Sequence, residues 1–323
     1  MDAIWQYQVA ITLFFQALGN WLILPMKAIS FLGQEEFFLV VMPAIYWCID
    51  AGLGLRLGVM LVVTSATNGW LKMIFQAPRP YWFDRRVSAF AIETSFGMPS
   101  GHSQSAMAMW GLMAWARRYR WLGWLAGGVI FLTGISRIYL GVHFVDQVLV
   151  GWMVGAILIW LFVRLEPYVL NLIKRLSLIT LVLVVLLISL GMVAVTVGIS
   201  LGAGPLPVAW VANAQAAAPQ EPVMPYDSSG LIALAGTWLG LGVGAAWDWR
   251  RHGPLAAGKT WQNQIVRYLV GLVGLLAVYL GLKLIFPGSQ DLISSIFRYI
   301  RYALVGLWVT ALAPAVFRRV RLV

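Results

Sequence analysis

Charged residues and cysteine are both scarce in this chain. Only 11% of its 323 residues are charged, whereas 61% are hydrophobic and the mean hydropathy is +0.81. The core of a soluble domain is too small to bury that much apolar surface. The composition therefore excludes a soluble globular domain. The single cysteine, Cys48, lies in an apolar run and cannot form an internal disulfide. The composition therefore predicts a polytopic membrane protein.

Alternating strand patterns are missing as well, and apolar stretches recur that approach the roughly 20 residues a helix needs to cross a bilayer. The predicted fold class is therefore all-α, a membrane helical bundle of about nine spans. The expected spans are residues 35–50, 52–74, 100–117, 121–140, 144–165, 176–203, 231–249, 265–286 and 292–317.

The first apolar run, residues 9–29, is interrupted by Asn20, Pro25 and Lys27. It is either a tenth span or a helix that lies in the membrane interface, and we favour the interfacial interpretation. No Lys or Arg precedes this run, which is unlike a cleaved signal peptide. We therefore expect the segment to remain in the mature protein.

Basic residues gather at one set of predicted helix ends. Short cytoplasmic loops of membrane proteins collect Lys and Arg, so this side is predicted to be cytoplasmic. Much of the net charge of +11 then reports topology, and nucleic-acid binding is not expected. The basic groups on this side are Arg117-Arg118-Tyr119-Arg120, Lys174-Arg175, Arg250-Arg251 with Lys259, and Arg318-Arg319 with Arg321.

A proline-rich loop at residues 202–230 is too broken to cross the membrane and divides the chain. We expect an N-terminal interfacial or additional membrane segment at 1–34 and a core that carries the polar motifs at 35–175. Accessory transmembrane helices should follow at 176–323, with an outward loop at 204–230. No convincing internal repeat is present.

Three polar clusters lie at the span ends opposite the basic loops. In the first, Lys72 closes a span and Arg79 follows Pro78 in a loop, so two cations reach one membrane face, where an anion could bridge them. Taken alone, this cluster also fits a snorkelling lysine and an ordinary loop arginine.

The second cluster, Pro99-Ser100-Gly101-His102, begins a span. Ser100 suits a helix N-cap, and Gly101 would let an anion approach backbone N–H groups at the helix N-terminus. Taken alone, this cluster is equally an ordinary capped helix start with a hydrogen-bonded histidine.

The third cluster is Ser136-Arg137 with His143. A charge near the end of an apolar span is expensive to bury unless it is paired or functional. If His143 is helical, Asp146 at i+3 and Gln147 at i+4 share its face, and either could hold one ring nitrogen and leave the other free to attack. An interfacial histidine beside an unrelated Asp is the alternative.

Together the clusters place three cations, two histidines and a helix N-terminus on one membrane face. This set fits phosphoryl transfer, in which cations and N–H dipoles neutralise the phosphate oxygens, one histidine attacks and the other protonates the departing oxygen. Carboxylates are too few near the clusters for a Mg²⁺ or Ca²⁺ site, and two histidines without a cysteine partner do not make a structural zinc site. No metal and no cofactor are therefore expected.

The clusters resemble the three-part signature of the type 2 phosphatidic acid phosphatase superfamily, which also includes vanadium haloperoxidases. Six residues separate Lys72 from Arg79-Pro80, and five separate Arg137 from His143. Between the parts lie 18 and then 33 residues, and the resemblance covers about residues 35–165. A six-span-type phosphatase core is the fold that it implies.

The resemblance also implies roles for individual residues. His143 would be the nucleophile that forms a phosphohistidine, and His102 the general acid for the leaving group. The phosphate oxygens would be held by Lys72, Arg79, Ser100, Gly101 and Arg137.

One position departs from the usual signature. The superfamily usually places Asp four residues after the nucleophilic histidine, whereas this chain has Gln147 there and Asp146 one residue earlier. A Gln four residues after the histidine is a feature of the glucose-6-phosphatase branch, which this chain resembles more closely at this position. Either residue could orient His143, and we favour Asp146 because a charged acceptor stabilises an imidazolium better than an amide does.

The expected substrate is a lipid phosphomonoester or diphosphate in the outer leaflet, because an outward site near Trp82, Phe83, Phe90 and Trp110 suits a lipid headgroup. A sugar phosphate is the alternative substrate.

A lipid or phosphate transporter on the same fold is an alternative class of function, but a carrier needs cations and neither nucleophile nor acid. A haloperoxidase would require bound vanadate. The bilayer is an expected partner, and the sequence does not predict the oligomeric state.

Overall fold

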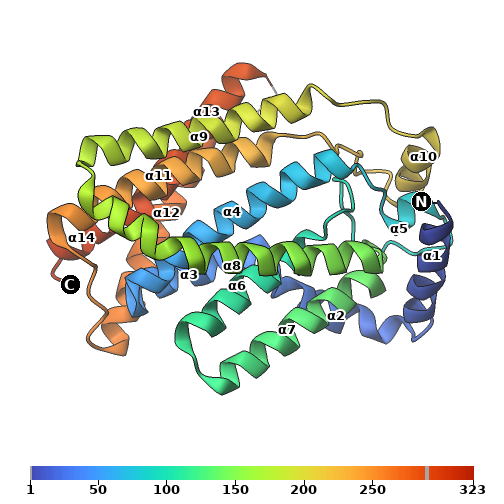
Figure 1. Cartoon of the computed structure of the whole chain (residues 1–323), viewed down its shortest axis with the longest axis horizontal. Coiled ribbons are helices and arrows are strands. Elements are labelled where there is room, and N and C mark those ends of the chain that lie inside the picture. The colour runs from blue at the N-terminus through green and yellow to red at the C-terminus, as the bar shows by residue number, and fades with distance from the viewer. Residues whose placement is uncertain (1, 288–290) are drawn as a thin grey trace. The chain divides into compact units, whose positions relative to one another are not determined.

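The computed structural model describes residues 2–287 and 291–323, and within these ranges the chain contains helices and no strands (Figure 1). This confirms the predicted all-α fold. The elements in chain order are α1 (Asp2–Gln16), η1 (Asn20–Leu22), α2 (Ile23–Phe31), α3 (Glu35–Ala44), η2 (Ile45–Ile49), α4 (Ala51–Phe75), α5 (Pro80–Phe83), α6 (Gly101–Arg117), α7 (Arg120–Tyr139), α8 (Val145–Arg175), α9 (Leu178–Ser200), α10 (Val208–Ala217), α11 (Ser229–His252), α12 (Trp261–Ile285), α13 (Leu292–Leu307), η3 (Trp308–Leu312) and α14 (Ala313–Arg319).

Seven helical stretches of the described residues are long and apolar enough to cross a membrane. They coincide with seven of the nine predicted spans. The other two predicted spans, 35–50 and 100–117, fall on the shorter stretches α3–η2 and α6. Helices α1 and α2 pass the same test only as a pair and are bent by 87° at the break between them.

The chain divides into two compact units. Unit 1 comprises residues 1–37, 67–161 and 199–227, and unit 2 comprises residues 38–66, 162–198 and 228–323. The boundaries fall inside α3, α4, α8 and α9, and one falls between α10 and α11. The sequence predicted a division at residues 34 and 175 from the positions of the motifs. The compact units do not test that division, which stays a prediction.

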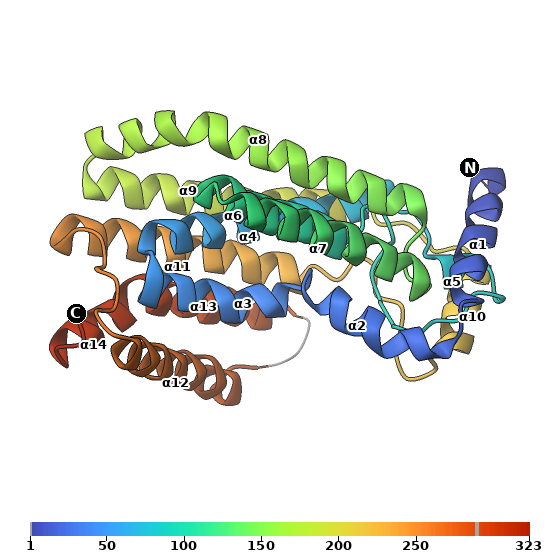
Figure 2. The same cartoon turned by 90° about the horizontal axis from the view of Figure 1, so that it is seen from below.

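Unit 1 is built around the antiparallel pair α6 and α7, which lie side by side (Figure 1). The chain reverses between them at Arg118, whose φ of +54° is in the left-handed region. Helix α1 runs across the direction of α7 (Figure 2). Aromatic side chains fill the core at that end, among them the fully buried Trp82, Phe96 and Phe144.

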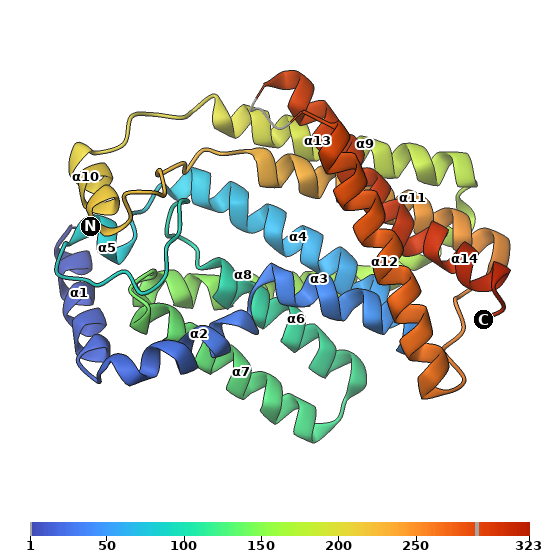
Figure 3. The same ribbon diagram turned by 180° about the vertical axis from the view of Figure 1, so that it is seen from behind.

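Unit 2 contains the closely packed helices α11 and α13, with α12 running alongside α13 (Figure 3). Small residues allow the close approach of α11 to α13, because a Cβ at Gly306 would lie 2.7 Å from the carbonyl oxygen of Thr237. Across another contact in this unit, the Ser189 hydroxyl donates to the carbonyl oxygen of Ala235 at 2.7 Å. Contacts of these kinds hold unit 2 together. All residues of the three motifs lie in unit 1.

Candidate active site

Arg79 is the most completely bonded cation of the three motifs. It is fully buried at the start of α5, where Pro80 occupies the first helical position. Its Nε donates to the carbonyl oxygen of Ser95 at 2.6 Å, and one terminal nitrogen donates to Ser95 Oγ and to the Phe96 carbonyl, both at 3.1 Å. The other terminal nitrogen lies 3.1 Å from the Val142 carbonyl and 3.2 Å from Nε2 of His143. All five N–H groups of this guanidinium therefore have acceptors.

Lys72 lies in the last turn of α4, and its Nζ donates to the same Ser95 hydroxyl at 2.9 Å. Ser95 thus joins the two cations of the first motif. The loop that follows α5 therefore supplies hydrogen-bond acceptors to both cations.

Arg137 lies in the last turn of α7 with only 2% of its surface exposed. One terminal nitrogen donates to Ser30 Oγ of α2 at 2.7 Å, and the other pairs with a carboxylate oxygen of Glu93. Its Nε is buried and has no hydrogen-bond partner among the described residues. This guanidinium therefore retains an unused donor.

Glu93 lies between the two guanidiniums. Its second carboxylate oxygen is 3.6 Å from a terminal nitrogen of Arg79, while the first pairs with Arg137. Burial alone would raise the pKa of Glu93, but Arg79 and Arg137 beside it hold that pKa well below its ordinary value. A negative charge is thus present between the cations proposed to bind phosphate.

The second motif forms the N-terminus of α6 as expected. Ser100 is the N-cap, and its Oγ accepts from the backbone N–H of Ser103 at 3.4 Å and from the Ser103 hydroxyl at 3.0 Å. Asn68 of α4 donates to the Pro99 carbonyl at 3.2 Å, and a Cβ at Gly101 would lie 3.0 Å from the Asn68 Oδ1. Asn68 therefore holds the start of α6 next to α4.

His102 carries an Nε2 that is buried and has no hydrogen-bond partner among the described residues. The ring lies close enough to Glu93 for their charges to interact. An unpartnered buried ring nitrogen is costly unless a ligand completes it. This atom is therefore available to a substrate.

His143 lies in the turn between α7 and α8, outside both helices. Gly141 makes the turn with a φ of +75°, which favours glycine. The backbone N–H groups of Val142 and His143 both donate to the Arg137 carbonyl, at 3.2 and 3.3 Å. The turn thus carries His143 back against the last turn of α7.

The His143 ring is oriented through Nδ1, which lies 2.8 Å from the carbonyl oxygen of Gly97 and 3.1 Å from Gln147 Oε1. A carbonyl oxygen can only accept, so Nδ1 carries the proton and Nε2 holds a lone pair. Gln147 is itself fixed, because its Nε2 donates to the Pro78 carbonyl at 2.8 Å. The lone pair of His143 lies next to the Arg79 guanidinium.

The expectation that Asp146 orients His143 does not match this geometry. Helix α8 begins at Val145, so His143 is not on its face, and the argument from helical spacing fails. Asp146 Oδ1 instead accepts from the Gln147 N–H at 2.7 Å, a favourable place for a carboxylate in the first turn of a helix. Gly97 and Gln147 hold the ring instead.

Burial, followed by the positive charges of Arg79, Arg137 and Lys72, lowers the pKa of His143 well below its ordinary value, and Glu93 acts in the opposite direction. The ring is therefore neutral near neutral pH. A neutral ring with a fixed Nδ1 proton is the form of histidine that can attack phosphorus through Nε2.

The loop between α5 and α6 supplies the contacts that sequence reasoning missed, namely Glu93, Ser95 and Gly97. The loop has no periodicity that would place its side chains. One signal was available, because Glu93 is the only carboxylate between residues 85 and 101. Gly97 also has to be glycine, since a Cβ there would lie 2.6 Å from Gln147 Oε1.

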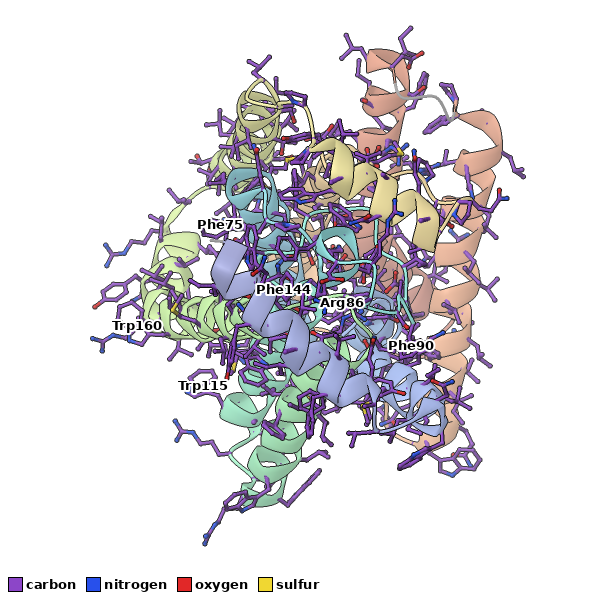
Figure 4. All side chains as sticks on the ribbon, turned by 90° about the vertical axis from the view of Figure 1, so that its right-hand side faces the viewer. Phe75, Arg86, Phe90, Trp115, Phe144 and Trp160 are labelled. Carbon is purple, nitrogen blue, oxygen red and sulfur yellow. The ribbon has the colours of Figure 1, made fainter. Side chains whose placement is uncertain are left out.

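Of the four aromatic residues expected around the site, Trp82 is buried, whereas Phe83, Phe90 and Trp110 are partly exposed. Trp82 is fully buried and packs at a tilt against Phe96, with ring centroids 6.4 Å apart. Trp110 lies in α6 and donates to the Leu32 carbonyl at 3.0 Å. Phe144, next to His143, is likewise buried, and it lies behind α1 in Figure 4. Trp82, Phe96 and Phe144 support the site from within the core.

Two family models match this chain. The PAP2 superfamily model matches residues 53–171, and a model described as "PAP2 superfamily phosphatase, transmembrane extension" matches residues 232–323. The first match includes every residue of the three motifs. The second lies within unit 2.

Three curated relatives each match less than half of the chain. Phosphatidylglycerophosphatase B of Bacillus subtilis is 30% identical over an alignment of 159 residues, and the match covers 44% of this chain and 73% of that protein. Human glucose-6-phosphatase 3 is 29% identical, over 43% of this chain and 47% of its own length. Mouse sphingosine-1-phosphate phosphatase 2 is 34% identical, over 40% of this chain and 38% of its own length. The matched part is thus less than half of the last two relatives.

A solved structure is also similar, the crystal structure of the first transmembrane PAP2 type phosphatidylglycerolphosphate phosphatase from Bacillus subtilis. It is 27% identical with a TM-score of 0.46, and the match covers 52% of this chain and 88% of that one.

Proposed function

Because this chain belongs to the PAP2 superfamily of phosphatases, we propose that it is an integral membrane phosphatase that hydrolyses a lipid phosphomonoester or diphosphate through a phosphohistidine intermediate. The observation that carries the proposal is the state of His143. Its Nδ1 proton is committed to Gly97, and its Nε2 lone pair lies beside Arg79 in a site that also contains Lys72 and Arg137.

In the first step, Nε2 of His143 attacks the phosphorus atom, so that an N–P bond forms and the P–O bond to the alcohol breaks. Arg79, Arg137 and Lys72 neutralise the charge on the three remaining oxygens. The phosphorylated ring is cationic, and the Gly97 carbonyl and Gln147 amide oxygen stabilise its Nδ1 proton. Ser100 and the N-terminus of α6 add neutral dipoles to the same site.

His102 transfers the protons. In its protonated form it gives a proton to the departing alcohol oxygen, and in its neutral form it then takes one from the water that attacks the phosphohistidine. The N–P bond breaks in this second step and inorganic phosphate leaves. The unpartnered Nε2 of His102 supports this assignment, because a reacting oxygen would complete its hydrogen bonding.

We further propose that the reaction needs no metal ion. Three side-chain cations supply the charge neutralisation that a divalent ion would otherwise provide. Within residues 2–287 and 291–323, no group of three His, Cys, Asp or Glu side chains is arranged to hold one. Activity measured in the presence of a strong chelator should therefore equal activity without it.

The proposed site faces the non-cytoplasmic side. His102 begins α6 and Arg137 ends α7, whereas the basic residues Arg117, Arg118 and Arg120 lie at the opposite end of this hairpin. A helix of 17 residues separates the two ends by about 25 Å. Because the basic end is expected in the cytoplasm, the end with the site is expected outside.

The proposed substrate class is a lipid phosphate, and a sugar phosphate is the second candidate. Two of the similar proteins are named for lipid phosphates, sphingosine-1-phosphate and phosphatidylglycerophosphate, and one for glucose-6-phosphate. A site at the outer end of membrane helices is within reach of lipid headgroups. Phosphate release from matched lipid and sugar phosphates would distinguish the two.

The test is phosphate release by the purified protein together with trapping of labelled phosphate on the enzyme. His143→Ala should abolish both release and labelling. His252→Ala is the matched control, because His252 lies in unit 2 and pairs with Asp248 at 3.1 Å, and it should behave as wild type. Release that survives in His143→Ala would overturn the mechanism. Phosphate binding without release by the wild-type protein would favour a carrier.

A further inference from the structure

Arg79 and Arg137 together form a cationic site, called the cradle below. In this structure the cradle binds a carboxylate of the same chain, that of Glu93. The two carboxylate oxygens of Glu93 face the two guanidiniums, one each. Two oxygens on one atom, shared between two guanidiniums, is also the arrangement that a phosphate group would adopt there. Phosphate and the Glu93 carboxylate therefore need the same positive charges.

We infer that Glu93 is an internal competitor for the phosphate group, and that its carboxylate leaves the cradle when phosphate binds and returns when phosphate is released. This inference rests on the proposed phosphate site. It goes further in that it assigns a role in ligand exchange to a residue outside the three motifs.

Repulsion between the two anions at the Arg79 and Arg137 contacts favours this exchange. Arg79 and Arg137 carry the two positive charges that face Glu93, and its carboxylate offsets one of them. A phosphate dianion placed beside the ionised carboxylate would meet a like charge in a largely buried site, where such repulsion is strong. The two anions therefore exclude each other from the contacts with Arg79 and Arg137.

The exchange requires only a side-chain rotation, because the backbone of Glu93 is fixed at both its polar groups. The hydroxyl of Tyr81 donates to the Glu93 carbonyl at 2.7 Å and accepts from the Glu93 N–H at 3.1 Å. Tyr81 is itself buried in the core. The Glu93 side chain, by contrast, is 25% exposed, which leaves it a route to solvent.

The neighbours of Glu93 are held by residues 199–227, which neither family model matches. The N–H of Met224 donates to the Thr94 carbonyl at 3.1 Å, and the Tyr226 ring meets Phe96 edge-on with centroids 5.2 Å apart. These contacts keep the loop in place while the carboxylate turns. They also explain how Ser95 can continue to hold Lys72 and Arg79 during the exchange.

Glu93 serves two purposes in this scheme. Without substrate, its carboxylate keeps two like-charged guanidiniums side by side. After hydrolysis, it displaces the product, inorganic phosphate, and so weakens product inhibition. Removing the charge should therefore strengthen phosphate binding and lower the stability of the ligand-free protein.

The experiment measures binding of inorganic phosphate to the full-length protein in detergent, by calorimetry and by the rise in melting temperature. Glu93→Gln keeps the shape of the side chain without its charge and should bind phosphate about tenfold more tightly than wild type. Asp84→Asn is the matched control, because Asp84 lies on the same loop but pairs with the exposed Arg86, and its affinity should be that of wild type.

Equal or weaker binding by Glu93→Gln would overturn the inference, as would an equal gain in Asp84→Asn. If Glu93→Gln is too unstable to purify, Glu93→Asp keeps the charge but cannot span both guanidiniums, and it should bind phosphate more tightly than wild type. Arg137→Gln separates the two proposals. Phosphate binding that does not depend on Arg137 removes the proposed phosphate site, whereas Arg137-dependent binding without a gain in Glu93→Gln removes only the role of Glu93.

Discussion

The carbonyl oxygen of Gly97 lies 2.8 Å from Nδ1 of His143, so the ring is oriented by a backbone atom that no side-chain substitution removes. Gln147 Oε1 adds a second acceptor at 3.1 Å. The tautomer that presents Nε2 to a substrate is thus set mainly by the loop between α5 and α6. Residues on α8 reinforce it.

This arrangement predicts unequal effects at two adjacent positions. Gln147→Ala removes one acceptor of Nδ1 and the donor to the Pro78 carbonyl, so kcat should fall about tenfold, while the Gly97 carbonyl preserves the rest. Asp146→Asn should leave kcat within about twofold of wild type, because Asp146 bonds the start of α8 rather than the ring. Steady-state kinetics on a lipid phosphate checks both. A larger loss in Asp146→Asn than in Gln147→Ala would contradict the assignment.

The lowered pKa of His143 predicts a ring that stays neutral as the pH falls through the ordinary value of about 6.5. Nuclear magnetic resonance of ¹³C-labelled histidine in the ligand-free protein should show a ring signal that is absent from His143→Ala and that does not titrate between about pH 7.5 and 5.5.

Folding stability should follow the same shift. A histidine whose pKa is lower in the folded than in the unfolded state contributes stability above the unfolded pKa, and this is lost as the pH falls below it. The melting temperature of wild type should therefore decline more steeply below about pH 6.5 than that of His143→Ala. A His143 signal with a midpoint at or above the ordinary value would contradict this prediction.

The outward orientation of the site predicts sided chemical labelling. In a Cys48→Ala background, Ser88→Cys in the exposed part of the loop after α5 should react with a membrane-impermeant maleimide added to intact cells. Tyr119→Cys, in the exposed turn between α6 and α7, is the matched control and should react only after permeabilisation. The reverse pattern would place the site on the cytoplasmic side.

From the hydrogen bonds of Asn213 we predict that α10 stabilises the position of α5, and so the site. Its Nδ2 donates to the Trp82 carbonyl at 2.9 Å, and its Oδ1 accepts from Nε of Arg85 at 2.6 Å. Asn213→Ala should lower the free energy of unfolding by about 1–2 kcal/mol and reduce kcat/KM several-fold, because α5 begins directly after Arg79. Gln215→Ala, at an exposed position of the same helix, should change neither quantity. Thermal unfolding and kinetics measure both, and equal effects in the two variants would exclude a specific role for Asn213.

The sequence by itself determined the membrane-spanning helices and the motif residues. Apolar runs near the thickness of a bilayer can satisfy their backbone polar groups only as helices, so their positions follow from composition and length. The spacings of Lys72 to Arg79 and of Arg137 to His143 depend on residue type and order, and both can be read along the chain.

Only the tertiary structure decided how those residues are held. Glu93, Ser95 and Gly97 lie in a loop without periodicity, and their partners are 14 to 46 residues away along the chain. The choice between Asp146 and Gln147 depended on where α8 begins, because a start at Val145 removes His143 from the helical face. Helix ends shift by one or two residues with the packing around them, so a pattern of i+3 and i+4 spacings does not resolve such a choice. The physical reason is that local spacing fixes which residues are near in sequence, whereas long-range packing fixes which atoms meet.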